Sequence, residues 1–183
     1  MKELSLNILD ITMNSVKAGA RNIILSLRET EDEFSFSVTD DGCGMTEDFL
    51  SRVTDPFCTN RTTRKVGLGI PFLKLMAEQT GGHIEIESRE ESEFPDTHGT
   101  TISAFFYKNH IDCLPLGDIV STLVTLIQGS PLIDFEFSHS FSGGKSVKLS
   151  TKELREVLGE VGLETPEVLL WIREYLEEQY KNV

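Results

Sequence analysis

The chain opens with a pattern of apolar residues that predicts a helix over residues 4–18. The apolar positions are spaced as on one face of a helix: Leu4, Ile8, Ile11 and Val16. Gly19 follows directly, and glycine readily adopts the left-handed conformation that ends many helices. The first element is therefore an amphipathic helix of about four turns.

The next segment changes from helical spacing to strict alternation. Apolar Phe34, Phe36 and Val38 alternate with small polar residues, which is typical of a half-buried strand. An acidic turn separates this strand from an apolar run that begins at residue 22, so the two form a hairpin. A short helix is predicted over residues 46–53, and the polar, basic stretch 54–66 has no period and is interpreted as a loop.

A second helix and a second hairpin follow this loop. Pro71 fits the first turn of a helix that ends near Gln79, because Gly81 and Gly82 come next. Strands are predicted at 83–88 and 100–106, joined by an acidic connection. Helix, hairpin, loop, helix and hairpin within residues 1–108 predict an α+β domain, a two-layer sandwich with helices on one face of a mainly antiparallel sheet.

Residues 109–183 read as a small α+β extension of unknown role. A helix is predicted over 116–129 and a hairpin over 135–149, with its turn at Gly143 and Gly144. Two helices follow, and their predicted starts are Ser150 with Glu153, which has the form of a capping box, and Thr165 with Pro166. The closing helix is predicted to dock through one stripe: Val168, Trp171, Ile172 and Tyr175.

Composition and charge narrow the class of protein. The net charge of −13 argues against binding to nucleic acid or to an acidic membrane surface, since clustered Lys and Arg make those contacts. Three scattered cysteines fit a reducing compartment and give no disulfide or zinc pattern. The amino-terminal segment is not a signal peptide, and no apolar run approaches the ~20 residues of a membrane span. We therefore expect a soluble, cytoplasmic protein.

Polar residues on the first helix are the first candidate for chemistry. Asp10, Asn14 and Lys17 are four and three residues apart and share one face. An amide oxygen at Asn14 could complete the shell of a phosphate-bound Mg²⁺, and a carboxylate at Asp10 could act as a general base. The alternative is a solvated stripe on a surface helix.

The sequence DDGCGM at 40–45 is the second candidate. Asp-Gly is an ordinary turn signal, and a plain turn is the alternative here. Two glycines, Gly42 and Gly44, exceed what a turn requires and allow a flat ligand to approach the backbone. A carboxylate at Asp40 can accept a hydrogen bond from the exocyclic amine of adenine.

The segment 55–72 is the third candidate. Gly67 and Gly69 lie just before a helix, where free amides form an anion site, and the cations of this segment would reinforce it: Arg61, Arg64 and Lys65. A dinucleotide fingerprint is excluded because Phe72 stands where the third glycine is needed, and no Walker motif is present. A phosphate site of another architecture is therefore predicted.

These segments together resemble a known superfamily. Asn14 with an acid four residues earlier, DxGxG at 40–44, the DPF lead-in at 55–57, GLGI at 67–70 and GTT at 99–101 occur in order. They are similar to the N, G1, F, G2 and G3 boxes of the ATP-binding superfamily of histidine kinases, anti-sigma-factor kinases, gyrase B subunits and mismatch-repair ATPases. The match covers residues 4–107.

The resemblance implies a Bergerat α/β sandwich that binds Mg-ATP, with residues 54–66 as the ATP lid. Asn14 would ligate Mg²⁺, Asp40 would hold adenine, and Thr100 would support the adenine side. The catalytic candidate is Asp10. The nucleotide-binding candidates are Asn14, Lys17, Asp40, Gly42, Gly44, Met45, Thr59, Arg64, Lys65, Gly67, Leu68, Gly69, Ile70 and Thr100.

Two functions follow from the resemblance. Only three residues precede the first box, and none of the four histidines falls on a helix of phosphoacceptor type, so we expect phosphoryl transfer in trans to a partner docked by 109–183. The alternative is an ATP-operated switch with slow or no hydrolysis, because position 10 is Asp rather than the Glu of related ATPases. The chain most resembles small stand-alone kinase-like proteins of anaerobic bacteria, some found beside hydrogenase or related redox subunits, which suggests a regulatory or redox-system partner. Homodimerisation stays open.

Overall fold

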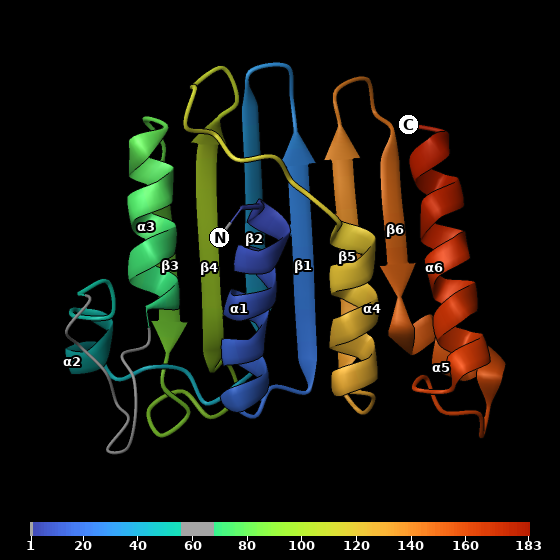
Figure 1. Ribbon diagram of the computed structural model, residues 1–183. Coiled ribbons are helices and arrows are strands. Elements are labelled where there is room, and N and C mark those ends of the chain that lie inside the picture. The colour runs from blue at the N-terminus through green and yellow to red at the C-terminus, as the bar shows by residue number, and fades with distance from the viewer. Residues whose placement is uncertain (1, 56–67) are drawn as a thin grey trace.

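A computed structural model describes residues 2–55 and 68–183 as twelve helices and strands (Figure 1). The first half contains α1 (Leu4–Lys17), β1 (Asn22–Glu29), β2 (Glu33–Asp40), α2 (Glu47–Leu50), α3 (Gly69–Gln79), β3 (His83–Arg89) and β4 (Gly99–Tyr107). The second half contains α4 (Ile119–Gly129), β5 (Asp134–Phe141), β6 (Ser146–Ser150), α5 (Thr151–Leu158) and α6 (Pro166–Lys181). The predicted order of elements is confirmed over the described residues.

One sheet runs through the whole molecule. Its strand order is β3-β4-β2-β1-β5-β6. Four of the described pairings are antiparallel, and β1 pairs in parallel with β5, for example Leu25 with Phe137. The mainly antiparallel sheet of the predicted fold is confirmed, and β5 and β6 of the extension continue it.

Helices cover one face of this sheet. Figure 1 shows α3, α1, α4 and α6 side by side in front of the strands. Alternation places Ile23, Leu25 and Leu27 of β1 on the covered face, where they are almost completely buried, while the side chains of the other face are half-buried or exposed. Ile8 and Ile11 of α1 are buried in the same core. The two layers are those of an α/β sandwich with its helices on one face.

Local signals set most of the element boundaries. Thr46 caps α2, because its hydroxyl accepts from the amide of Phe49. Ser150 caps α5 in the same way through the amide of Glu153. α3 begins at Gly69, so Pro71 lies in its first turn as predicted. Most of the predicted loop 54–66 lies outside the described residues.

The docking stripe predicted for α6 is partly wrong. Val168 and Ile172 are buried, but Trp171 and Tyr175 are 47% and 40% exposed and stack on each other with ring centroids 5.0 Å apart. The buried stripe is completed instead by Leu169 and Leu176. Leucines fit between helix and sheet without leaving a polar group unpaired, whereas Trp and Tyr keep their N–H and O–H at the surface. As a result, α6 carries an exposed aromatic pair, Trp171 and Tyr175, instead of burying it.

Candidate functional site

A cavity of about 420 Å³ lies at the end of the sheet where β2 finishes and α3 begins. Its walls come from α1, the end of β2, the start of α3 and β4. Ten of the residues predicted from the sequence line it: Asp10, Asn14, Lys17, Asp40, Gly44, Met45, Leu68, Gly69, Ile70 and Thr100. Segments up to 90 residues apart in the sequence therefore meet around one space of the size that small ligands occupy.

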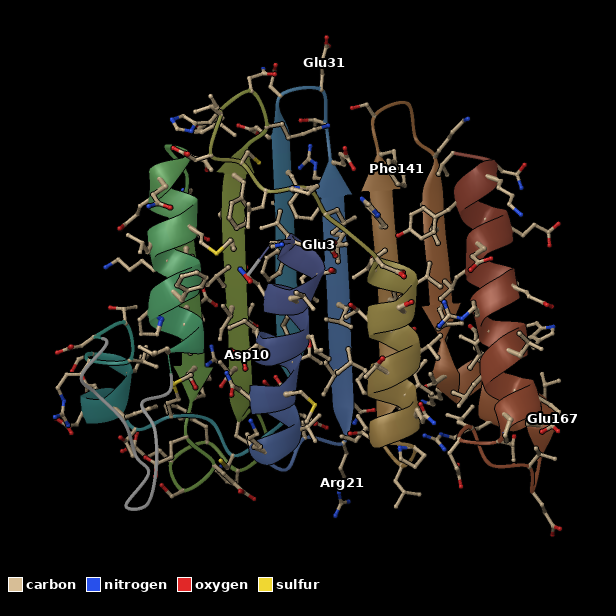
Figure 2. The ribbon with its side chains drawn as sticks, viewed as in Figure 1. Glu3, Asp10, Arg21, Glu31, Phe141 and Glu167 are labelled. Atoms are coloured by element: carbon tan, nitrogen blue, oxygen red, sulfur yellow. The ribbon has the colours of Figure 1, made fainter. Side chains whose placement is uncertain are left out.

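The polar face of α1 lines this cavity. Asp10, Asn14 and Lys17 all border it, as their spacing along the helix predicts. Figure 2 shows Asp10 on the side of α1 that faces β4 and α3. Asp10 and Asn14 are half-buried and Lys17 is exposed, so the polar face of α1 borders the cavity and also reaches solvent.

Asp40 is held by two hydrogen bonds at the floor of the cavity. Its Oδ2 accepts from the hydroxyl of Ser15 at 2.5 Å, and its Oδ1 accepts from the amide of Gly42 at 2.9 Å. These contacts fix the carboxylate plane, so that it presents its remaining acceptor capacity in one direction. Ser15 was not predicted as a site residue, although it follows Asn14 directly in the sequence and is 5% exposed.

Contacts with neighbouring segments fix the conformation of the glycine loop after β2. Gly44 has a φ of +68°, and a Cβ there would lie 1.9 Å from the carbonyl oxygen of Arg89. Only glycine fits this approach. The amide of the next residue, Met45, donates to the Ser88 hydroxyl at 2.8 Å, which in turn lies 2.9 Å from Thr100 Oγ1. Ser88 thereby links two of the predicted boxes.

A histidine supports the same loop from the other side. His98 donates from Nδ1 to the carbonyl of Gly42 at 2.6 Å. Gly42 itself does not line the cavity and acts through the main-chain contacts that it makes to His98 and Asp40. His98 lies directly before GTT in the sequence, and its contact with Gly42 was not predicted.

The start of α3 meets Asp10. A Cβ added at Gly69 would lie 2.1 Å from Asp10 Oδ2 and 3.8 Å from Asn14 Nδ2, so glycine leaves the space that these side chains use. A carboxylate beside the amino-terminal end of a helix is electrostatically favourable. The amide oxygen of Asn14 is of the ligand type that Mg²⁺ prefers, so this residue fits the predicted metal.

The remaining predicted residues belong to the lid segment 54–66 or follow it directly. Thr59, Arg64, Lys65 and Gly67 lie outside the described residues, as does Arg61. Two apolar residues that the sequence did not indicate, Phe49 and Val53, also line the cavity. They belong to the segment 46–53, for which the sequence predicted a short helix but no role in the site.

Asp41, the second acid of DDG, has a structural role that differs from the position of Asp40 at the cavity. Its Oδ1 accepts from the amides of Arg21 and Asn22, and its Oδ2 accepts from Asn22 Nδ2 at 2.6 Å. Burial raises the pKa of this carboxyl, but the hydrogen bonds from Asn22 and Arg21 outweigh it and hold the pKa below 3.8. Asp41 therefore ties the glycine loop to the start of β1.

Asp41→Asn should destabilise the fold at neutral pH by about 1 kcal/mol, since the carboxylate is partly exposed and loses charge-assisted hydrogen bonds. Because the folded-state pKa is lowered, the contribution is complete above the unfolded-state pKa and disappears as the pH falls through the folded-state value. Urea unfolding at pH 7 and below pH 3 measures both. An equal difference at the two pH values would contradict this role.

Comparison with known proteins agrees with this architecture. The family model described as histidine kinase-, DNA gyrase B- and HSP90-like ATPase matches residues 1–110. Sporulation kinase E of Bacillus subtilis is 34% identical over 91 residues, which cover 49% of this chain and 12% of that protein. Sensor protein KdpD of Clostridium acetobutylicum is 31% identical over 90 residues, 46% of this chain and 10% of that protein.

A solved structure extends the likeness beyond residue 110. The crystal structure of the N-terminal domain of a DNA repair protein aligns with a TM-score of 0.58 at 16% identity, covering 89% of this chain and 59% of that one. At this identity the likeness concerns the fold alone.

The fold is that of the Bergerat-type α/β sandwich. More particularly, the chain belongs to the family of histidine kinase-, DNA gyrase B- and HSP90-like ATPases. It spans about a tenth of the length of the two curated relatives. No helix in residues 2–55 and 68–183 is long and apolar enough to cross a membrane.

Proposed function

We propose that this protein binds Mg-ATP in the cavity beside α1 and transfers the γ-phosphoryl group in trans to a side chain of a partner protein. The observation that carries the proposal is the meeting of Asp40, the acidic and amide face of α1 and the start of α3 around one space. Membership in a family of ATPases supports the proposal that the ligand is a nucleotide. The roles of the individual residues are part of the proposal.

Asp40 would accept a hydrogen bond from the exocyclic amine of adenine, since Ser15 and Gly42 already orient it. The phosphates would meet the amides at the start of α3. Mg²⁺ on Asn14 would neutralise phosphate charge. Asp10 would then remove the proton of the attacking hydroxyl or water as that oxygen attacks phosphorus.

The partner would dock on residues 109–183. This region presents the stacked Trp171 and Tyr175, with Val157 and Leu170 also exposed, so apolar surface is available for a protein contact. The partner side chain would be Ser, Thr or His of a regulatory or redox-system protein in the cytoplasm. The net charge of −13 supports a protein partner over nucleic acid or a membrane surface.

Calorimetry and phosphate labelling test the two halves of this proposal. Mg-ATP and Mg-ADP should release binding heat at micromolar to millimolar concentration. γ-labelled ATP incubated with the protein and its co-purifying proteins should then label one of them. Absence of binding heat at millimolar nucleotide would overturn the whole proposal. Binding and ATP turnover without a labelled protein would overturn only the kinase half.

The second candidate function is an ATP-operated switch. The contact between Asp10 and the start of α3 favours it, because nucleotide phosphates and this carboxylate would compete for the same helix end. ATP would then move α3 relative to α1 and change the surface offered to a partner. Slow or no hydrolysis distinguishes this function from a kinase.

A further inference from the structure

A second cavity, of about 670 Å³, lies at the opposite end of the sheet from the first. Glu29 ends β1 and Phe141 ends β5, so the cavity opens at the carboxyl ends of the parallel strand pair. Figure 2 shows Phe141 at the end of the molecule away from Asp10. The start of α4 and the end of α6 form the other walls, and the size is that of a small-molecule site.

A buried histidine lines this cavity with one nitrogen unused. His139 is 1% exposed, and its Nδ1 lies 2.9 Å from the hydroxyl of Tyr180. Its Nε2 has no hydrogen-bond partner among the described residues and is 3.6 Å from Glu29 Oε2, beyond hydrogen-bond distance. Burial lowers the pKa of His139 to about 4 although Glu29 opposes this, so the two do not form an ion pair at neutral pH.

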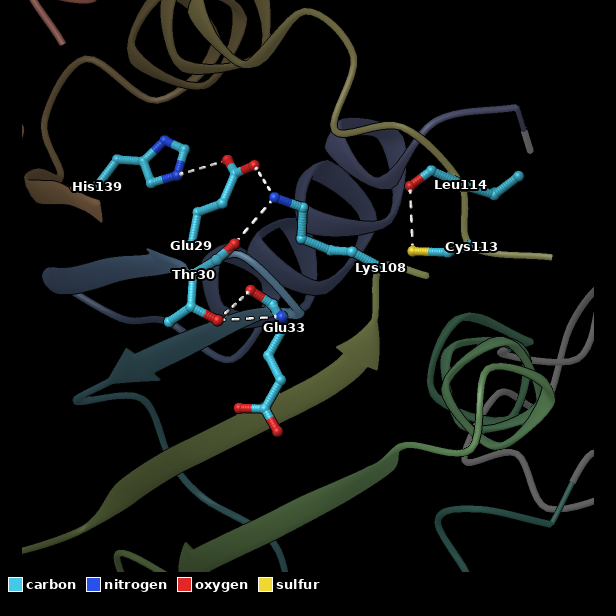
Figure 3. A network of polar contacts seen from close by, with 7 residues as sticks. All are labelled: Glu29, Thr30, Glu33, Lys108, Cys113, Leu114 and His139. Carbon is cyan, nitrogen blue, oxygen red and sulfur yellow. Dashed lines mark hydrogen bonds and ion pairs between the residues drawn. The ribbon is translucent and has the colours of Figure 1, made fainter. Parts of the chain in front are cut away.

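Glu29 is satisfied on one side only. Its Oε1 pairs with Lys108 Nζ at 2.6 Å, and the same ammonium donates to the Thr30 carbonyl (Figure 3). Its Oε2 lies 3.6 Å from His139 Nε2, which is beyond hydrogen-bond distance. A half-buried carboxylate oxygen and the buried, unpaired ring nitrogen therefore lie close together at the cavity, and leaving the ring nitrogen unpaired is costly.

The charges around the cavity favour a cation over an anion. The start of α4 is already capped, because Asp118 accepts from the amide and hydroxyl of Ser121. Glu177 and Asp118 add negative charge to that of Glu29, while Lys181 contributes one cation and Lys108 is used by its ion pair. An anion would meet the carboxylates of Glu29, Asp118 and Glu177.

The rest of the wall is apolar or aromatic. Leu116, Ile119 and Val120 line it from the α4 side, and the rings of Phe141 and Tyr180 stand edge to face with centroids 6.3 Å apart. Aromatic faces attract cations as well as apolar groups. A ligand for this site combines an apolar body with one charged donor.

We propose that this second cavity binds a small organic amine, whose protonated nitrogen is held by Glu29 Oε2 and whose apolar body packs against Phe141 and Val120. The site is independent of the nucleotide cavity, and it places a ligand between β1 of the ATPase fold and α6 of the carboxyl-terminal region. Its ligand class is a primary amine on an aromatic or aliphatic stem.

Three probes of similar shape but different charge, each titrated into the full chain, test which ligand charge the cavity prefers. Phenethylamine should bind saturably by calorimetry and shift the amide resonances of Ile119 and Phe141. Phenylethanol and hydrocinnamate, which are neutral and anionic, should bind at least about tenfold more weakly. Equal or stronger binding of the anion, or no saturable binding of the amine at millimolar concentration, would overturn the proposal.

Two neighbouring glutamates on α6 provide a matched pair of variants. Glu177 lines the cavity and Glu178 does not, and both are exposed, so neither change threatens folding. Glu177→Lys should weaken the amine about two- to fivefold, and Glu178→Lys should leave it nearly unchanged. Glu29→Gln should weaken it at least about tenfold, with Glu31→Gln at the hairpin tip as its control. Equal effects of Glu177→Lys and Glu178→Lys on amine affinity would show that the amine binds outside this cavity.

Discussion

Asp40→Asn lowers the affinity for Mg-ATP by about tenfold to a hundredfold, because hydrogen bonds to a charged group contribute about 1.5–3 kcal/mol. The substitution keeps the size of the side chain but replaces one carboxylate oxygen with an NH2 group, so either the Ser15 hydroxyl or the Gly42 amide then faces a second donor. Only one acceptor oxygen remains, and the preference for an adenine amine is lost. Calorimetry with Mg-ATP and Mg-GTP measures the affinity and the loss of base selectivity together.

Asp41→Asn is the control for this experiment. It makes the same chemical change one residue away, on a carboxylate that binds Arg21 and Asn22 rather than facing the cavity. It should lower stability while leaving nucleotide affinity within about twofold, because it touches no cavity wall. If both variants lose affinity equally, the effect of Asp40 is on folding of the loop rather than on adenine.

Local sequence patterns were enough to predict most of the helices and strands. Period-two alternation identified β2 because one face of the sheet is covered and the other is not. The same alternation says which residues of β5 face inward but nothing about its partner strand. Its parallel pairing with β1 joins segments more than 100 residues apart. For that reason the sequence predicted a separate extension but not the continuation of one sheet.

The α6 error has a related cause. Two overlapping stripes, one through Trp171 and Tyr175 and one through Leu169 and Leu176, both fit a helical period and both share Ile172. Which stripe is buried depends on the rotation of the helix against α4 and β6, which is a property of the packed molecule. Periodicity alone could not choose between them.

Many residues that line the first cavity were predicted, because the glycines, acids and amide among them occur in an ordered set. What escaped prediction are residues that act through others. Ser15 and Ser88 are ordinary serines in the sequence, and only the fold brings their hydroxyls to Asp40 and Thr100. His139 likewise gave no signal as a strand histidine, since its burial depends on α6 closing over the end of β5.

Asp10→Asn separates the two proposed functions. If Asp10 is the general base of a kinase or ATPase, the variant should lose about a hundredfold to ten-thousandfold in turnover, since proton transfer by a positioned side chain contributes that much. Its affinity for Mg-ATP should change little, because the amide keeps the shape of the carboxylate next to Gly69. Single-turnover assays with labelled ATP, beside calorimetry of the same sample, measure the two quantities.

Asp10→Glu supplies the opposite variant. One added methylene moves the carboxylate by about 1 Å, and a misplacement of that size costs about a hundredfold when a base is already well placed. A rate that rises in Asp10→Glu and collapses in Asp10→Asn would show a base held short of its best position. Unchanged turnover in both variants would exclude Asp10 as the base. Altered partner binding with that unchanged turnover would favour the switch, because the carboxylate would then act only through its contact with the start of α3.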